Sequence, residues 1–242
     1  MTALLAVEGI SKRFRGLLAV DDVSFQVARG SIFAVIGPNG AGKTTLFNVI
    51  AGTFVPDRGS IAFGGERIDG FTPDEVCRRG IGRTFQLVRP FPTLSVEDNV
   101  LIGAMLRRRD PASARRRAHE VLVRLELFGK RHQPASALTL PDRKRLEVAR
   151  ALATDPKLLL LDEVMAGLRP AETDRMVSIL SELNRELGLT ILLIEHVMRA
   201  VMALAARVLV LHHGAPIAEG APDAVVRDPA VVQSYLGAEA VD

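Results

Sequence analysis

The first residues able to do chemistry lie in a glycine-rich segment, Gly37-Pro38-Asn39-Gly40-Ala41-Gly42-Lys43-Thr44, which fits the pattern G-x-x-x-x-G-K-[ST]. Glycines let the backbone curl so that successive N–H groups point at phosphate oxygens. Lys43 would place a positive charge on the β- and γ-phosphates, and the Thr44 hydroxyl would be a ligand for Mg²⁺. Together with Thr45, the segment predicts a site for Mg-ATP. A chance glycine-rich turn is the weaker interpretation, because a predicted strand precedes the segment and a predicted helix follows it.

A pair of carboxylates could complete this site. Asp162 and Glu163 directly follow four leucines, a run typical of a strand buried on both faces. We expect Asp162 to hold Mg²⁺, and Glu163 to face the γ-phosphate and polarise an attacking water. A helix cap or a solvated turn would also explain such a pair, but the phosphate-binding pattern elsewhere in the chain favours the catalytic interpretation.

The elements that must position these residues alternate along the chain. Alternation of strands and helices predicts an α/β core with a parallel sheet, and the first thirty residues add strands of alternating apolar pattern. Residues 88–155 are rich in helix formers and are predicted to be a helical insertion. The tail, residues 222–236, is predicted to form two short helices. Further strands are expected at residues 31–36, 59–63, 158–161, 190–194 and 207–212, and helices at residues 44–51, 171–187 and 196–205.

Composition narrows the class of protein. The chain has 242 residues, 48% hydrophobic and 24% charged, with a net charge of +3 and Cys77 as its only cysteine. An internal disulfide is therefore impossible, and the sequence shows neither a signal peptide nor an apolar run of the roughly 18 residues that span a bilayer. These features predict a cytoplasmic protein. A basic stretch could contact lipid headgroups or nucleic acid, but a solvated helix face is favoured, since acidic residues interrupt it and aromatic residues are missing from it. The stretch comprises Arg107, Arg108, Arg109, Arg115, Arg116 and Arg117.

Two more motifs complete a family pattern. Gln86 ends the sequence Gly82-Arg83-Thr84-Phe85-Gln86, and His196 ends Leu193-Ile194-Glu195-His196. With the phosphate loop and the carboxylate pair, in this order and spacing, the chain resembles the ATP-binding subunits of ABC transporters over essentially its whole length. The resemblance implies that Gln86 ligates Mg²⁺ and senses the helical subdomain. It also implies that His196 contacts the γ-phosphate, as a catalytic residue beside Glu163 and Lys43, and that Phe14 stacks on adenine. For Phe14, a core aromatic is the competing interpretation.

Longer matches resemble the ATPase subunits of branched-chain amino-acid importers. They are the sequences at residues 79–86, 92–100, 145–153 and 232–236. The resemblance implies an α/β fold of the P-loop NTPase (ABC ATPase) type, with a mostly parallel sheet, an N-terminal antiparallel β subdomain and a helical subdomain. Residues 1–242 would form one such domain. Residues 1–87 with 156–242 would make the β subdomain and the core, and residues 88–155 would make the helical subdomain with the signature segment.

One segment departs from this family. Such ATPases usually form head-to-tail dimers, in which a signature, typically Leu-Ser-Gly-Gly-Gln, completes the ATP site of the other chain. The matching residues here are Leu138-Thr139-Leu140-Pro141-Asp142. Thr139 keeps a hydroxyl for a phosphate, but Pro141 has no N–H. Asp142 would repel a phosphate by about 3 kcal/mol per unit charge at about 5 Å and an effective dielectric near 20, and Arg143, Lys144 and Arg145 would offset part of that repulsion. The same residues also resemble a helix start with a capping box. Val164 and Arg169 are smaller departures, where a proline and an aspartate are usual.

The resemblance finally implies partners and a location. Transmembrane permease subunits would bind the helical region, a periplasmic solute-binding protein would act indirectly, and the chain would lie on the inner face of the cell membrane. The unusual signature predicts a heterodimer with a sister ATPase, with a homodimer as the alternative, and no nucleic acid is expected. The preferred function is an importer for branched-chain amino acids or related small solutes. A lipid or lipopolysaccharide export ATPase, a nucleotide-gated binding module, and, last, a ribosome- or DNA-directed ABC protein are the alternatives.

Overall fold

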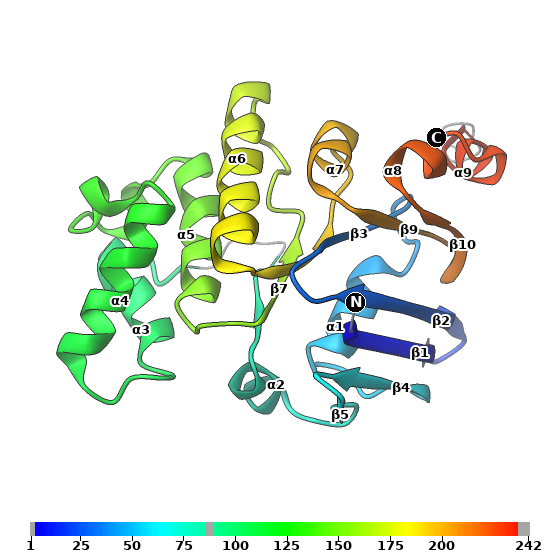
Figure 1. Ribbon diagram of the computed structural model, residues 1–242, viewed down its shortest axis with the longest axis horizontal. Coiled ribbons are helices and arrows are strands. Elements are labelled where there is room, and N and C mark those ends of the chain that lie inside the picture. Colours follow the sequence, from blue (N-terminus) through cyan, green and yellow to red (C-terminus); the bar gives the residue numbers. More distant parts are fainter. Residues whose placement is uncertain (1–2, 86–89, 237–242) are drawn as a thin grey trace.

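The computed structural model describes residues 3–85 and 90–236, which contain two β-sheets (Figure 1). The larger sheet has six strands in the order β10-β9-β3-β8-β7-β6, parallel except for β10. Every residue of its three central strands is buried, as their uninterrupted apolar sequences predict. The strands are β3 (Ile32–Ile36), β6 (Ile81–Arg83), β7 (Leu158–Asp162), β8 (Thr190–Ile194), β9 (Arg207–His212) and β10 (Ala215–Gly220).

The smaller sheet is antiparallel and lies on the other side of the first helix, α1 (Figure 1). Its order is β2-β1-β4-β5. Phe33 and Val35 of β3 share a core with Leu46 and Phe47 of α1 and with this sheet, so the loop between β3 and α1 is anchored at both ends by buried elements. The elements are β1 (Ala3–Phe14), β2 (Leu17–Ala28), α1 (Lys43–Ile50), β4 (Arg58–Phe63) and β5 (Glu66–Arg67).

Helices cover the opposite face of the large sheet and extend beyond one end of it, where α3 and α4 lie (Figure 1). Ile32, Ala34 and Ile36 of β3 belong to this second core. No helix of the described residues is long and apolar enough to cross a membrane. The remaining elements are α2 (Pro73–Arg79), α3 (Val96–Ala104), α4 (Pro111–Arg124), α5 (Leu140–Leu152), α6 (Pro170–Leu187), α7 (Met198–Leu204), α8 (Pro222–Val225), α9 (Pro229–Leu236), and the 3-10 turns η1 (Phe128–Lys130) and η2 (Ala135–Ala137).

The predicted α/β class, with a mostly parallel sheet and an antiparallel N-terminal sheet, is confirmed. Four elements were not predicted: the short strands β5 and β6, the edge strand β10 and the helix α2. The basic stretch is helical only in part, because Arg115, Arg116 and Arg117 belong to α4 whereas Arg107, Arg108 and Arg109 lie in the connection between α3 and α4. Several of these arginines are already paired. Arg108 and Arg117 contact Asp155, and Arg115 contacts Glu97, at 2.5 to 2.9 Å.

Candidate functional site

The phosphate loop needs glycine at two positions for steric reasons. A Cβ on Gly37 would lie 2.1 Å from the Leu211 carbonyl oxygen, and one on Gly42 would lie 2.3 Å from the Ala19 carbonyl oxygen. Gly42 also has φ of 98°, a left-handed conformation in which it precedes α1. The loop therefore folds tightly against the neighbouring strands, and its backbone can approach a ligand without side chains in the way.

Lys43 begins α1 and reaches back over the loop. Its Nζ donates to the carbonyl oxygens of Gly37 at 2.7 Å and Pro38 at 2.9 Å, and the residue is only 6% exposed. Burial lowers the pKa of Lys43, while the charges of Glu163 and Asp162 oppose that change. The ammonium group is thus held over the concave side of the loop, where phosphate oxygens can replace the two carbonyl partners.

A cavity of about 400 Å³ opens at this loop. It brings together most of the predicted nucleotide contacts and the predicted catalytic Glu163. The remaining walls come from β2 and from the β9–β10 turn, which the sequence did not indicate. The cavity is lined by Asn39, Gly40, Ala41, Gly42, Lys43, Thr44, Thr45 and Glu163, together with Leu17, Leu18, Ala19, His213 and Gly214.

Asp162 ends β7 and is completely buried. Neither carboxylate oxygen has a hydrogen-bond partner among the described residues, and the nearest cation is Arg83, with Nη2 at 3.7 Å from Oδ2. Burial raises the pKa of Asp162, against the charge of Arg83. Two orphaned buried oxygens fit a hard cation such as Mg²⁺. Within the described residues no cluster of three or more His, Cys, Asp or Glu could hold a metal alone, so the ion would need nucleotide oxygens as further ligands.

Glu163 directly follows β7 with φ of 50°, a left-handed conformation that is costly for a residue with a side chain. Its N–H donates to the Ile194 carbonyl oxygen at 3.0 Å, which continues the pairing of β7 with β8. His196 lies just beyond the end of β8 and is exposed, and it does not line the described cavity. The structure therefore places Glu163, but not His196, beside the phosphate loop.

Phe14, the predicted adenine contact, does not line the cavity at the phosphate loop. Phe14 is 37% exposed and packs edge-on against Phe54, with ring centroids 5.0 Å apart. It is absent from the cavity lining, whereas Leu17, 68% exposed, is part of it. The stacking role of Phe14 stays a prediction. Gln86, predicted as a magnesium ligand, lies outside the described residues.

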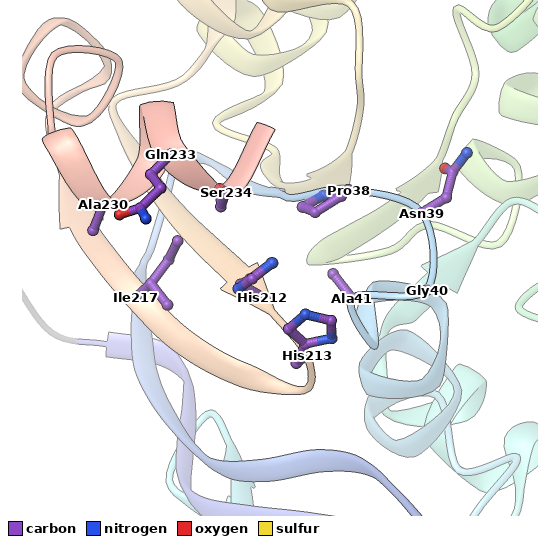
Figure 2. A pocket seen from close by; sticks show the side chains of 10 residues that line it. All are labelled: Pro38, Asn39, Gly40, Ala41, His212, His213, Ile217, Ala230, Gln233 and Ser234. Atoms are coloured by element: carbon purple, nitrogen blue, oxygen red, sulfur yellow. The ribbon is translucent and has the colours of Figure 1, made fainter. Parts of the chain in front are cut away.

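A second cavity of about 620 Å³ lies on the outer side of the phosphate loop (Figure 2). His212 and His213, with ring centroids 4.0 Å apart, form one wall and residues of α9 form another. Pro38, which the sequence placed among the nucleotide contacts, lines this cavity and not the one beside Glu163. The Gly37 N–H also hydrogen-bonds Tyr235 of α9, so the C-terminal helix supports the loop from outside.

The signature segment corrects one expectation. Thr139 is the N-cap of α5 and Pro141 lies in its first turn, as predicted, but the Thr139 hydroxyl donates to the Asp142 carboxylate at 2.9 Å and makes no cap hydrogen bond. Asp142 is 2% exposed and forms ion pairs with Lys130 and Arg145. The charge of Asp142 is therefore compensated inside the chain by Arg145, which was expected to offset it, and by Lys130, which was not; the repulsion of a phosphate stays a prediction.

Known proteins are similar to this chain in sequence and in fold. A family model described as ABC transporter matches residues 20–166, and one described as Branched-chain amino acid ATP-binding cassette transporter matches residues 215–241. The high-affinity branched-chain amino acid transport ATP-binding protein LivG of Salmonella typhimurium is 39% identical, over 97% of this chain and 98% of LivG. The lipopolysaccharide export system ATP-binding protein LptB of Acidithiobacillus ferridurans is 35% identical, over 98% of each. The crystal structure of the ADP conformation of MJ1267, an ATP-binding cassette of an ABC transporter, superposes with a TM-score of 0.89, at 33% identity over 98% of this chain and 100% of that chain.

Proposed function

The chain belongs to the ABC transporter ATP-binding family, and from that premise we propose that it hydrolyses ATP to drive an importer of branched-chain amino acids or related small solutes. One observation carries the catalytic part: Glu163 lines the same cavity as the phosphate loop. The match of residues 215–241 to the branched-chain transporter model favours this substrate class over lipopolysaccharide, the cargo of the more distant relative LptB.

In this proposal each residue has a defined task. The loop N–H groups and the Lys43 ammonium bind the β- and γ-phosphates, while Thr44 and Asp162 hold Mg²⁺, which when bound neutralises phosphate charge. The Glu163 carboxylate accepts a hydrogen bond from a water whose oxygen attacks the γ-phosphorus, and the bond from that phosphorus to the ADP oxygen breaks. His196 and Gln86 would complete the site from the β8–α7 connection and from the segment after β6.

The helical region, residues 88–155, is proposed to bind the permease subunits at the inner face of the membrane. Large apolar side chains are exposed on and beside α3, which is the composition expected of a protein interface. They are Phe91, Ile102, Met105 and Leu106, each 38 to 53% exposed. A periplasmic solute-binding protein would reach the chain only through those permeases.

A sister ATPase is proposed as the dimer partner. The signature segment of this chain offers few donors to a phosphate, because Pro141 lacks an N–H and the Thr139 hydroxyl is engaged by Asp142. A regular signature on the sister would complete the site of Glu163, while Thr139 would complete a weaker one. ATPase rates of this chain alone and mixed with its sister test the idea. We expect substantial turnover only in the mixture, and rapid turnover of a homodimer would contradict it.

Replacement of Glu163 by Gln tests the central assignment. In membranes reconstituted with the permeases, the sister ATPase and the solute-binding protein, Glu163→Gln should lower ATP turnover by about 10²-fold or more. Leucine uptake should fall with it, while stabilisation by Mg-ATP is retained. The exposed Glu8→Gln serves as a matched control. Unchanged uptake with Glu163→Gln would identify a nucleotide-gated binding module, and lipopolysaccharide release in place of uptake would identify an export ATPase.

A further inference from the structure

The strained backbone of Glu163 is held from two sides by buried charged side chains to which the sequence analysis assigned no role. Lys144 of α5 is 6% exposed, and its Nζ donates to the Glu163 carbonyl oxygen at 2.9 Å. Glu195, 1% exposed, accepts the Met165 N–H on Oε1 at 2.9 Å. We propose that Lys144 and Glu195 are positioning residues that fix the turn carrying the catalytic Glu163 and tie that turn to the helix beginning at the signature segment.

The hydrogen bonds of this turn explain why it needs such support. A left-handed residue other than glycine costs on the order of 1–3 kcal/mol unless its surroundings enforce that conformation. Backbone partners supply only part of the constraint: Glu163 N–H to Ile194 and Ala166 N–H to the Glu163 carbonyl oxygen, at 3.0 and 3.2 Å. The Lys144 ammonium adds a charged donor to that same carbonyl, and hydrogen bonds to charged groups are stronger than neutral ones.

Charge accounts for the choice of Lys144 as the donor. Burial lowers the pKa of Lys144, and the surrounding negative charges oppose that change; they belong to Glu195, Glu163, Asp162 and Glu147. Oε2 of Glu195 is buried and has no hydrogen-bond partner among the described residues, so the carboxylate relies on its contact with Met165 and on the nearby positive charge. Lys144 therefore binds the β7–α6 turn at the Glu163 carbonyl oxygen, and its charge acts on Glu195, which binds the same turn at the Met165 N–H.

Because Lys144 belongs to α5, its hydrogen bond connects the Glu163 turn to the helix that begins at the signature segment. Thr139 caps α5, and Lys144 follows it by little more than one helical turn. A helix moves as a rigid element, so a displacement of the signature segment shifts the donor bound to the Glu163 carbonyl oxygen. The catalytic carboxylate then responds to the occupancy of the signature segment of its own chain, in addition to the nucleotide in its own cavity.

The test uses Lys144→Met, which keeps the apolar stem but removes the donor and the charge. The proposal rests on the catalytic role of Glu163, so Glu163→Gln is assayed in parallel in the complete transporter. A displacement of about 1 Å can cost on the order of 10²-fold in rate. We expect Lys144→Met to lower kcat of the ATPase 10- to 100-fold, with KM for ATP and the Mg-ATP-induced rise in Tm unchanged within twofold. Lys144→Arg should restore most of kcat, because it restores the donor.

The matched control is Arg116→Met on α4, which is exposed and carries the same charge change. A kcat of Lys144→Met equal to that of Arg116→Met would overturn the proposal, and so would a loss of kcat that Lys144→Arg does not reverse. If Lys144→Met does not fold, hydrogen exchange of residues 163–168 in Glu195→Ala replaces it. Faster exchange than in the wild type supports the proposal, and unchanged exchange overturns it. Failure of the proposed function gives a different result, since Glu163→Gln would then keep wild-type turnover.

Discussion

The Thr139 hydroxyl lies 2.9 Å from Oδ2 of Asp142, inside the segment that aligns with the family signature. The opposite oxygen of the same carboxylate accepts from Arg145 at 2.5 Å, and Lys130 binds Oδ2 as well. Burial would raise the pKa of Asp142, but these hydrogen bonds outweigh it and hold the pKa below its ordinary value. The start of α5 is thus stabilised by an anion of the chain itself.

Asp142→Asn should therefore destabilise the fold more than it affects nucleotide binding in this chain. Removal of the charge leaves Lys130 and Arg145 without their buried partner, but Lys130 is exposed enough to regain water and Arg145 keeps its ion pair with Glu126. We therefore expect a loss of about 2 kcal/mol in the free energy of unfolding. Urea unfolding at pH 7 measures it. Asp223→Asn, at an exposed position, should change stability by at most about 0.5 kcal/mol. Equal effects of the two variants would contradict this account of the segment.

Two glycines of the phosphate loop should differ sharply in their tolerance of alanine. Both have positive φ, 77° for Gly40 and 98° for Gly42, so both substitutions carry a conformational cost of about 1–2 kcal/mol. A Cβ on Gly40 meets nothing within 4 Å, whereas one on Gly42 lies 2.3 Å from the Ala19 carbonyl oxygen. Gly42→Ala should lower Tm by several degrees more than Gly40→Ala. Similar thermal unfolding curves for the two variants would show that the loop relaxes away from β2.

Glu195 predicts a pH dependence of stability. Burial raises its pKa to about 7, with the charge of Glu163 in the same direction and the Met165 N–H and Lys144 opposing. The folded chain therefore holds the Glu195 proton more tightly than the unfolded chain, in which the pKa is near 4.3. The stability that this difference contributes is fully present below pH 4.3 and is lost as the pH rises to about 7. Over that range the wild type should lose roughly 3 kcal/mol relative to Glu195→Gln. Unfolding in urea from pH 4.5 to 8 measures the difference. The exposed Glu8→Gln should show no such trend, and a constant gap for Glu195→Gln would refute the assignment.

The parts of the site that are contiguous in sequence were predictable. A buried parallel strand and a glycine-rich turn each have a strong pattern in the local sequence. This made it possible to predict the strand before Gly37, the loop itself and the carboxylates that follow four leucines. β6 and β10 lack such patterns. β6 has three residues with Gly82 in the middle, and β10 carries Pro216 and Glu219, which an edge strand tolerates and an apolar alternation would exclude.

The residues that support the site were not predictable, for a different reason. Lys144 and Glu195 look like surface helix and loop residues in the sequence, and only the packing of α5 against the end of β7 and β8 buries them. For Asp142 the compensation was predicted in part: Arg145 lies one turn further along the same helix, whereas Lys130 belongs to η1, ahead of the segment. Charge compensation of this kind depends on tertiary distances, which a single sequence does not contain.

Substitution of Asp162 should have opposite effects on the stability of the nucleotide-free chain and on the binding of Mg²⁺. Its buried carboxylate has no hydrogen-bond partner among the described residues, and burial raises its pKa, so the ionised group is a cost to the nucleotide-free fold. Asp162→Asn keeps the shape and removes the charge. We expect a higher Tm than the wild type without nucleotide at pH 7, together with loss of the further rise in Tm that Mg²⁺ gives when added to ATP.

Differential scanning fluorimetry without nucleotide, with ATP, and with ATP and Mg²⁺ measures both effects of Asp162→Asn, and the control Asp223→Asn should match the wild type. A magnesium effect that survives in Asp162→Asn would remove Asp162 from the metal site, and a lower Tm without nucleotide would show that Arg83 and Lys43 depend on its charge.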